Sequence, residues 1–553
     1  MVEFNARVPS PESRVPSPES RVPSPEVRSR SLLLVLLALA ACAPRATTAP
    51  GAPTSGAATS GAPTPPSAEM RGVWIATVSN IDWPSVASRG DSARQKTELR
   101  TLLDRAAADG MNAVILQVRS GADALYTSRL EPWAGLLTGT PGTDPGWDPL
   151  AFAIDEAHAR GLELHAWFNP YRAGSARDSL ALPANHVFRT NRDLVRVYGG
   201  ALWMDPGDPA VPERTLAAMT DVVRRYDVDG VHIDDFFYPY PQYDSTRKAI
   251  DFPDSATWAA HNPRNLSRAD WRRDNVNRFV ERMYAEVHRV KPWVKVGISP
   301  FGIWRPGTPA QIKGLDPVES IYADSRVWLQ RGWLDYFVPQ LYWAIDPPAQ
   351  SFTALLDWWT QPEQNPLGRP VWPGLASYRV DTTALRPDSA TLPRIADSAT
   401  FSYRPDEILR QVRETRARAS RHASGVVFYN GSSVLVRAGG AMGQRVRDSL
   451  FTAPALVPPM PWLGGGAPGR PTVATIADTT VDGAAAVVAR VAPAGGEPSR
   501  WWAVSWRVNG AWTPAERAWG GARSLVRRGG ADGVAVWGVS RTGVLGEAAL
   551  VGR

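Results

Sequence analysis

Between residues 69 and 455, short apolar segments alternate with longer segments in which apolar positions recur every three to four residues. The short segments have the length of buried strands, and the longer ones have the period of amphipathic helices. Strands are predicted at Val73–Val78, Ala113–Val118, Leu162–Phe168, Gly230–Asp234, Val294–Ser299, Tyr336–Leu341, Val371–Leu375 and Gly425–Tyr429. Helices are predicted at Ala93–Ala108, Pro149–Arg160, Pro212–Tyr226, Arg268–Val290 and Ser320–Arg331. Because continuously apolar strands that alternate with helices build parallel sheets covered on both faces, the pattern predicts an α/β fold.

The eight predicted strands favour a (β/α)8 TIM barrel at residues 69–455 over an open doubly wound sheet. A doubly wound nucleotide-binding sheet carries a glycine-rich turn after its first strand. Here Val78 is followed by Ser-Asn-Ile-Asp-Trp-Pro, which holds no such turn. We therefore expect a barrel whose chemistry lies at the C-terminal ends of its strands.

After the barrel the pattern changes twice. Residues 456–471 are rich in Pro and Gly and predict a linker. Residues 472–553 hold short alternating segments separated by turn residues, which predicts a small all-β sandwich. These segments are Ala486–Val491, Trp501–Val508, Ser524–Arg527 and Gly533–Val539. The stretch Trp537-Gly-Val-Ser-Arg-Thr-Gly543 is similar to the ending of fibronectin type III modules.

Residues 1–42 predict an export segment. Residues 7–27 repeat a seven-residue unit whose prolines exclude helices and central strands, and one interpretation of residues 1–30 is upstream sequence translated from a misplaced start codon. Two arginines then precede the apolar stretch Leu32–Ala41, which is the order of a secretory signal. This stretch is shorter than the ~20 residues that span a bilayer. Residues 43–68, made mostly of Ala, Pro, Thr, Ser and Gly, predict a disordered tether.

The chain has a single cysteine, Cys42, at the end of the apolar stretch. The segment Leu39-Ala-Ala-Cys42 resembles a bacterial lipobox, in which the cysteine is lipidated. The alternative is a plain signal peptide with an incidental cysteine. By the same resemblance, Ala43 in place of an aspartate implies sorting to the outer membrane, on its periplasmic face.

Composition narrows the function further. The net charge is +7, but residues 69–455 are nearly neutral, so no domain collects the basic surface that nucleic-acid binding requires. One Cys and 7 His exclude a disulfide framework and disfavour a metal centre, and we expect no cofactor. Tryptophan is abundant, with 23 residues. Flat amphipathic rings in this number are a first indication of a carbohydrate ligand.

Polar and aromatic residues follow nearly every predicted strand. Strand alternation places Val231 and Ile233 toward the helices and His232 and Asp234 toward the barrel interior. The candidate substrate contacts at these strand ends are Asn80, Gln117, His165, Trp167, Asn169, Tyr171, Arg172, His232, Trp304, Gln340, Tyr342 and Trp343. For each aromatic side chain the alternative is core packing, which is the expectation for Trp358 within a helical pattern.

The fourth strand ends in two adjacent acids, Asp234 and Asp235, followed by two phenylalanines. Neighbouring, partly desolvated carboxylates repel each other, so we expect one of them to hold a proton near neutral pH. Hydrolysis of a glycosidic bond uses such a pair, one acid and one carboxylate. Asp234 is the first candidate and Asp235 the second, while Asp205 and, less strongly, Asp82 are alternative partners. The competing interpretation is structural, with one acid binding an interior Arg or His and the other capping a turn.

At these residues a family becomes recognisable. The motifs occur in order as Arg71-Gly-Val-Trp-Ile-Ala, Glu131-Pro-Trp, Gly146-Trp-Asp-Pro-Leu, Glu156-Ala-His-Ala-Arg-Gly, His165-Ala-Trp-Phe-Asn-Pro-Tyr-Arg172, Asp205-Pro-Gly, Val228-Asp-Gly-Val-His-Ile-Asp-Asp-Phe-Phe-Tyr-Pro239, Ala323-Asp-Ser-Arg and Pro339-Gln-Leu-Tyr-Trp343. Together, over about residues 69–450, they resemble the glycosyl-hydrolase-like family ten of bacterial envelope lipoproteins. The resemblance implies a (β/α)8 barrel in the cell envelope, cleavage of peptidoglycan glycan strands stripped of stem peptides, and divisome proteins as partners. Carried over by position, Asp234 and Asp235 fall on the paired-acid motif of the family.

We therefore expect a lipid-anchored glycoside hydrolase that acts on bare peptidoglycan glycan by carboxylate acid/base catalysis. Two alternatives remain at this point. One is a catalytically silent envelope lipoprotein that binds peptidoglycan, and the other is a hydrolase of an exogenous polysaccharide.

Overall fold

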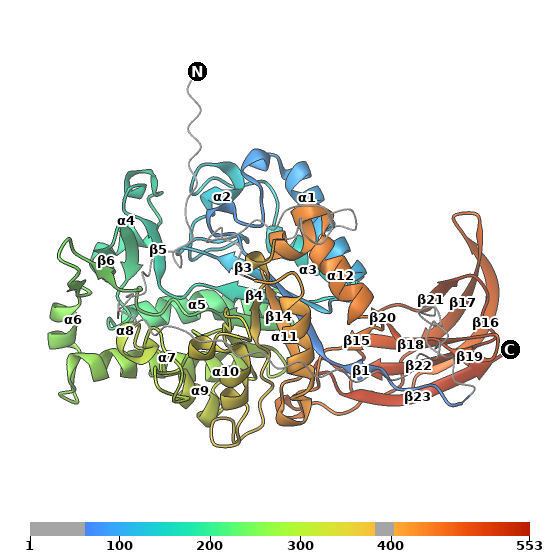
Figure 1. The fold of residues 1–553 in the computed structure, drawn as a ribbon. Helices are drawn as coiled ribbons and strands as arrows, with labels where there is room; N and C mark the ends of the chain where they lie inside the picture. Colours follow the sequence, from blue (N-terminus) through green and yellow to red (C-terminus); the bar gives the residue numbers. More distant parts are fainter. Residues whose placement is uncertain (1–60, 382–402) are drawn as a thin grey trace, which may run out of the picture.

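The computed structural model describes residues 61–381 and 403–553, so the export segment, Cys42 and most of the tether lie outside the described residues. At its centre is an eight-stranded parallel sheet in the order β12-β11-β8-β4-β3-β2-β14-β13 (Figure 1). In chain order the strands are β2 Met70–Ile75, β3 Ala113–Arg119, β4 Glu163–Phe168, β8 Gly230–Ile233, β11 Lys295–Ile298, β12 Tyr336–Phe337, β13 Gly374–Ala376 and β14 Gly425–Tyr429. Isolated parallel bridges from Phe337 to Val371 and from Gln340 to Gly374 join the two edges of the sheet. The predicted parallel α/β sheet is confirmed.

The sixth and seventh predicted strands are shorter than expected. The segment Tyr336–Leu341 forms regular strand only at Tyr336–Phe337, and Val371–Leu375 only from Gly374. Pro339 and Pro373 lie in these segments, and proline has no N–H to donate to a strand ladder. These prolines explain why single bridges replace continuous pairing where the sheet closes.

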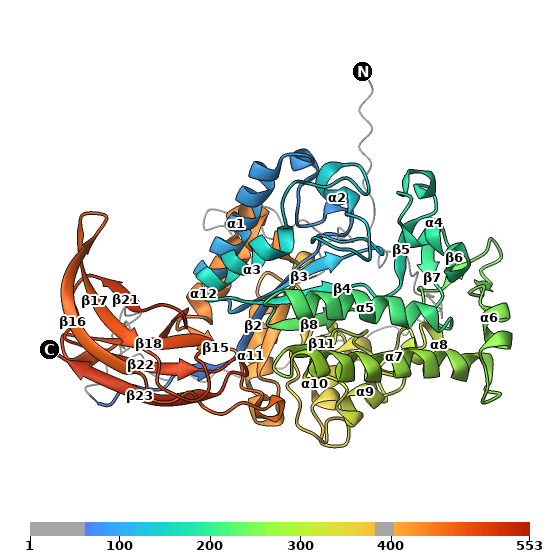
Figure 2. The ribbon, with the colours of Figure 1, turned by 180° about the vertical axis from the view of Figure 1, so that it is seen from behind.

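Helices cover the outside of the sheet, and α5 and α7 pack against each other along it (Figure 2). The longer helices are α1 Ser92–Ala108, α3 Pro149–Ala159, α5 Ala210–Arg225, α7 Arg268–Val290, α10 Phe352–Trp359, α11 Glu407–Arg416 and α12 Ala441–Ser449. Side chains cap the first turns of α1, α3, α7 and α10, as Asp91 does by accepting from the Arg94 amide and Asp148 from the Ala151 amide. Within the two described ranges, no helix has the length and apolarity needed to cross a membrane.

The predicted helix Ser320–Arg331 is two helices, α8 Pro317–Ser320 and α9 Ser325–Arg331. Tyr322 lies between them with φ +58°, a left-handed conformation that a continuous helix cannot contain.

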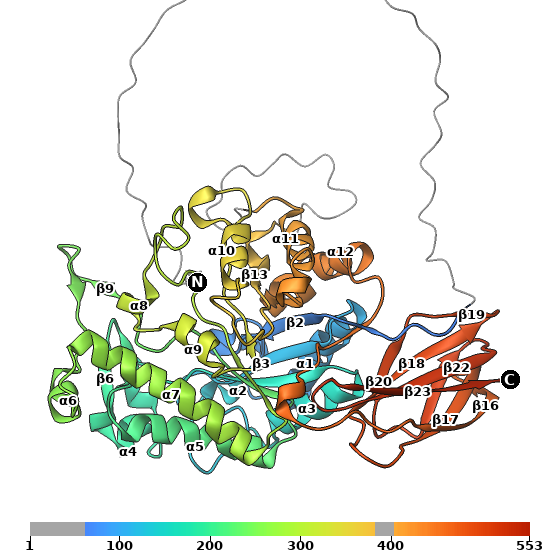
Figure 3. The same cartoon turned by 90° about the horizontal axis from the view of Figure 1, so that it is seen from below.

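The long segments around β8 carry structure that the sequence pattern did not predict. After β4 come β5 Arg172–Ser175, α4 Val187–Thr190, β6 Val195–Tyr198 and β7 Ala201–Met204, and after β8 come β9 Gln242–Tyr243, β10 Ala249–Ile250 and α6 Ser255–Ala260. Strands β5, β7 and β6 form a small antiparallel sheet. Figures 1 and 3 place this sheet and α6 at one end of the barrel, opposite the C-terminal strands.

Large rings fill the barrel interior. Trp74, Tyr336 and Trp372 are at most 2% exposed and belong to one interior cluster. The fit depends on Gly297, because a Cβ there would lie 1.9 Å from the ring of Tyr336. The interior of the barrel is therefore a packed core below the strand ends, with no open channel at this level.

The C-terminal residues form two antiparallel sheets. Strands β16 Thr472–Val481, β17 Ala484–Ala492 and β21 Ser524–Arg528 make one sheet, and β18 Trp501–Val508, β19 Ala511–Trp512, β20 Glu516–Trp519, β22 Gly533–Val539 and β23 Leu545–Gly552 make the other. Side chains from both sheets, among them Val487, Trp502 and Val536, share one hydrophobic cluster. The unit is all-β as predicted, while its likeness to fibronectin type III modules stays a prediction.

The segment predicted as a linker begins as packed structure. Strand β15 Ala455–Leu456 pairs with β1 Ser67–Ala68, so the end of the predicted tether is also ordered. Val457, Met460 and Leu463 then join the interior cluster of the barrel. Because that cluster includes Met70 and Ala113 at the start of their strands, these apolar side chains close the N-terminal end of the barrel.

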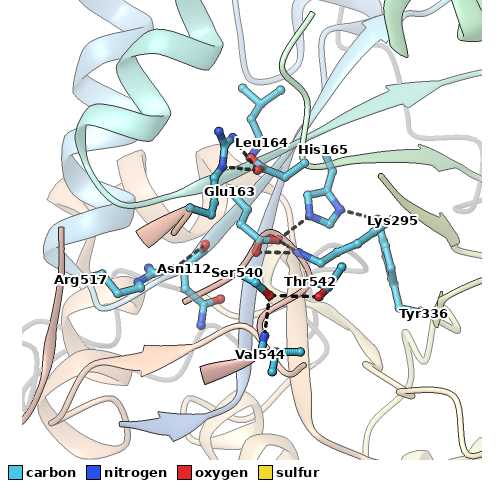
Figure 4. Close-up of polar contacts among 12 residues, drawn as sticks. Asn112, Glu163, Leu164, His165, Lys295, Tyr336, Arg517, Ser540, Thr542 and Val544 are labelled. Atoms are coloured by element: carbon cyan, nitrogen blue, oxygen red, sulfur yellow. Dashed lines mark hydrogen bonds and ion pairs between the residues drawn. The ribbon is translucent and has the colours of Figure 1, made fainter. Parts of the chain in front are cut away.

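Arginines of the C-terminal unit also contact the N-terminal ends of the barrel strands. Arg500 donates to Asp229 at 2.6 Å and to Asp227 at 2.7 Å, both just before β8. Arg517 of β20 donates to the carbonyl of Asn112 at 3.3 Å, just before β3. Figure 4 draws Arg517 and the turn at Ser540–Val544 together with a buried pair, Glu163 and Lys295, at the starts of β4 and β11. The C-terminal unit therefore covers the ends of the strands at which this pair is buried.

Candidate active site

The opposite, C-terminal ends of the strands bring the two predicted acids together with several of the predicted contacts. Asp234 and Asp235 directly follow β8, and each is only 4% exposed. Their side-chain partners come from β4 and the segment after it, from the segment after β8 and from the segment after β12. The alternation prediction is confirmed here, since Val231 and Ile233 join the apolar cluster outside the barrel and His232 contacts interior side chains.

Asp234 accepts only from neutral donors. Its carboxylate receives hydrogen bonds from the indole of Trp167 at 3.0 Å, from the amide of Asn169 at 3.2 Å and from the Phe236 backbone N–H at 3.2 Å. None of these three N–H groups can accept a proton in return. This arrangement favours the ionised form of Asp234.

Asp235 has partners of a different kind. One carboxylate oxygen accepts from Gln340 Nε2 at 2.9 Å, and the other contacts the hydroxyl of Tyr240. A hydroxyl can donate or accept, so it can bind a protonated carboxyl group as well as a carboxylate. Within the described ranges, neither acid forms an ion pair with a cation.

Burial raises the pKa of both acids. The pKa of Asp234 rises to about 6, chiefly through desolvation, against its hydrogen bonds. The pKa of Asp235 rises to about 7, through desolvation and then through the charge of Asp234. This agrees with the expectation that one of the two acids holds a proton near neutral pH.

Below the acids, interior polar groups form a continuous chain. His232 Nε2 lies 2.8 Å from Ser299 Oγ and 3.3 Å from the indole nitrogen of Trp74, which can only donate. Nε2 is therefore the acceptor, and Nδ1 donates to the Tyr336 hydroxyl at 3.2 Å. Burial keeps the pKa of His232 well below its usual value, so the ring is neutral. The polar side chains directly below the acid pair, with His232 among them, are therefore neutral.

Aromatic rings and one arginine complete the surroundings. Tyr342 and Tyr429 stack with ring centroids 5.7 Å apart, and Tyr429 also contacts Trp74 edge to face. Arg172 places its guanidinium 5.4 Å from the ring centroid of Phe236, the residue after the acids. Its backbone N–H donates to Asn169 Oδ1 at 3.1 Å.

Several predicted contacts are held elsewhere. Tyr171 is corrected to a core residue, because it is fully buried and packs on Phe279 of α7. Trp304 stacks on Trp358, and its indole N–H donates to Asp324 instead of to Asp234 or Asp235. His165 lies lower in the barrel, between Glu163 and Tyr336.

The remaining predicted contacts serve local structure. Gln117 accepts from the Thr77 and Val78 amides, Asn80 donates to the Pro84 and Leu136 carbonyls, and Trp343 packs edge to face on Phe301. None of the three has a hydrogen bond to the acid pair within the described residues.

The alternative acids are also engaged. Asp205 accepts from Thr257 at 2.6 Å and pairs with Arg196 at 3.0 Å, which ties the small β5–β7 sheet to α6 and not to Asp234. Asp82 accepts from the Ala76 and Ser432 amides and so links the loops after β2 and β14. Burial raises the pKa of Asp82 to about 6. Neither alternative contacts Asp234 or Asp235 in the described structure.

Sequence reasoning missed Tyr240, which lies five residues beyond the acids in Phe-Phe-Tyr-Pro-Tyr. It also left out Asp123, whose charge acts on Arg172. The only feature of the sequence that could have identified these two residues is that each lies in a segment that follows a predicted strand. In residues 61–381 and 403–553, no group of three or more His, Cys, Asp or Glu side chains is placed to hold a metal ion.

The chain is similar to known proteins over most of its length. Glycosyl hydrolase YngK of Bacillus subtilis is 39% identical over 420 residues, which cover 74% of this chain and 77% of YngK. Glycosyl hydrolase DigH of Escherichia coli K12 is 34% identical over 381 residues, which cover 65% of this chain and 85% of DigH. Among solved structures, the glycoside hydrolase domain of PgaB (BpsB) from Bordetella bronchiseptica aligns with 69% of this chain and 98% of its own, at 14% identity and a TM-score of 0.43. The model of the family named glycosyl hydrolase-like 10 matches residues 69–390, and the chain belongs to this family.

Proposed function

We propose that the protein is a glycoside hydrolase that cleaves peptidoglycan glycan strands freed of their stem peptides. The observation that carries the proposal is the acid pair after β8, which is nearly buried, has raised pKa values and is bound by neutral partners. The names of YngK and DigH as glycosyl hydrolases support the activity. The choice of peptidoglycan rests on the family resemblance of the sequence motifs.

The partners of the two acids support different roles for them. Asp234 accepts from three N–H donors and is therefore the carboxylate that stabilises positive charge at the anomeric carbon. Asp235, whose pKa is raised to about 7 and which faces the Tyr240 hydroxyl, holds the proton and delivers it to the leaving oxygen. Water then attacks the anomeric carbon in place of the leaving sugar and gives a proton to Asp235, which restores the acid. Gln340 and Asn169 hold the two acids in place from opposite sides of β8.

Purified protein is expected to release soluble fragments from sacculi treated with an amidase, and fewer from untreated sacculi. The physical reason is that a stem peptide on alternate sugars adds bulk beside a nearly buried acid pair. Chromatography of the released material measures the result, with chitin and a plant glucan as parallel substrates. Binding of sacculi without release would favour a silent peptidoglycan-binding protein, and preferential glucan cleavage would favour an exogenous substrate.

We also propose a lipid anchor at Cys42 in the outer membrane, divisome proteins as partners, and a fibronectin type III-like C-terminal unit. Cys42→Ala is expected to move the protein from the membrane fraction to the soluble envelope fraction, because the substitution removes the only thiol available for lipidation. Fractionation followed by immunoblotting measures this, with Cys42→Ser as a second variant. Unchanged membrane association of both variants would rule out the anchor.

A further inference from the structure

Arg172 lies beside the acid pair, and among the described residues its guanidinium has no hydrogen-bonded partner. It begins β5, three residues after Asn169, and only its backbone N–H bonds to Asn169. Within residues 61–381 and 403–553, its guanidinium forms no hydrogen bond or ion pair and lies over the ring of Phe236. Arg119, two strands away, shows the usual arrangement, since it donates to Glu131 at 2.6 and 2.7 Å.

The surroundings of Arg172 are polar enough to keep its charge but do not neutralise it by contact. Burial lowers the pKa of Arg172, while the charges of Asp234 and Asp123 act in the opposite direction. Asp234 is held by Trp167 and Asn169, and Asp123 accepts from the Gly121 amide at 2.9 Å. A half-buried cation without a hydrogen-bonded anion is stabilised when a ligand supplies one.

The position and the planar shape of the Arg172 guanidinium indicate which anion it binds. The guanidinium of Arg172 lies over the ring of Phe236, the residue after the acids, and the charge of Asp234 acts on it, so an anion bound there belongs to the same substrate as the scissile bond. A planar guanidinium matches a carboxylate with two parallel hydrogen bonds. When stem peptides are removed from peptidoglycan at the lactyl amide, each muramic acid gains a free carboxylate. A strand that keeps its peptides presents a neutral amide at the same place.

We propose that Arg172 binds the free lactyl carboxylate of a peptide-free glycan strand and thereby sets the preference for such strands. The inference rests on the proposed function and adds its specificity-determining residue. It predicts that the preference depends on the charge of the lactyl group and not only on the absence of the peptide.

The test compares two soluble substrates that differ only in this charge. One is glycan strands released from peptides by an amidase, and the other is the same strands with their lactyl carboxylates converted to neutral amides by carbodiimide and ammonia. Wild-type kcat/KM is expected to be about 10- to 100-fold higher on the acidic strands, the range for a charge-assisted pair of hydrogen bonds. Arg172→Gln is expected to reduce this ratio to within about 3-fold, with Arg172→Lys between the two. Arg177→Gln, at an exposed position in the same segment, should keep the wild-type ratio.

Each other outcome has a separate meaning. Equal loss on both strands in Arg172→Gln would show that Arg172 positions the acids and does not read the carboxylate. Equal wild-type rates on both strands would overturn the inference and leave the proposed function intact. Absence of cleavage of either strand by wild type would overturn the proposed function. Calorimetric binding of the two strands to wild type and Arg172→Gln would then still decide whether Arg172 recognises the carboxylate.

Discussion

Asp235→Asn is expected to lower kcat on peptide-free glycan strands by about 10²- to 10⁴-fold, the range that a positioned general acid contributes. The side chain keeps its size and can keep its hydrogen bonds to Gln340 and Tyr240, but it has no proton to give to the leaving oxygen. Asp234→Asn is expected to cause a loss of similar size, because a neutral amide cannot stabilise the cationic transition state. Steady-state release of soluble fragments measures both. Asp244→Asn, an exposed acid in the same segment, serves as the matched control.

The pH dependence separates this loss from unfolding. In wild type, activity should be highest when the pair holds one proton, hence between pH values near the pKa values of about 6 and about 7. Because the pKa of Asp235 in the folded protein is raised from 3.8, its contribution to stability is full below pH 4 and is lost as pH rises through 7. Asp235→Asn should therefore melt at a higher temperature than wild type at pH 8 and at a similar one at pH 4. An inactive variant that also melts early at pH 8 would contradict the proposed role.

Strand periodicity predicts that Asp234 faces the interior beside Trp167 for one physical reason. Trp167 and Asp234 lie on adjacent parallel strands, and a period of two fixes which side chains face the interior. That argument ends where the strand ends. Trp304 occupies the same kind of sequence position as Trp167, but the segment before it pairs only through a single isolated bridge at Phe301, and its ring stacks on Trp358 of α10.

The sequence pattern could not predict contacts that depend on how distant segments meet. Tyr240 reaches Asp235 because the chain turns back at two prolines after β8, which no periodicity describes. The small β5–β7 sheet consists of four-residue strands inside a long segment, too short to show alternation. Leu456, Met460 and Leu463 looked like linker residues because they stand among Pro and Gly. Met460 and Leu463 are buried because they pack on the interior cluster of the barrel, and Leu456 because it packs with Trp501 and Trp537 of the C-terminal unit.

Lys295→Met is expected to destabilise the fold by about 3–5 kcal/mol, the cost of leaving one charge of a buried pair without its partner. Lys295 Nζ lies 2.7 Å from both carboxylate oxygens of Glu163, and both side chains are at most 4% exposed (Figure 4). Their other neighbour is His165, whose ring nitrogen lies 3.1 Å from Glu163. Urea denaturation at pH 8 measures the loss. Lys313→Met, at an exposed position, is the matched control.

The pH dependence and the double variant test the electrostatic cause of this loss. In wild type, burial acts to raise the pKa of Glu163, but the charge of Lys295 and the hydrogen bond with His165 outweigh burial, so the pKa is lowered. Its contribution to stability is therefore present above pH 4.5 and is lost as pH falls below that value. Without Lys295, desolvation raises the pKa of Glu163, the folded protein takes up a proton, and the deficit relative to wild type should shrink from pH 8 to pH 5. Glu163→Gln combined with Lys295→Met should recover much of the loss at pH 8, because neither charge of the buried pair is then left without its partner. A deficit that is the same at both pH values and in the double variant would mean that lost packing beneath Tyr336, and not charge, causes the instability.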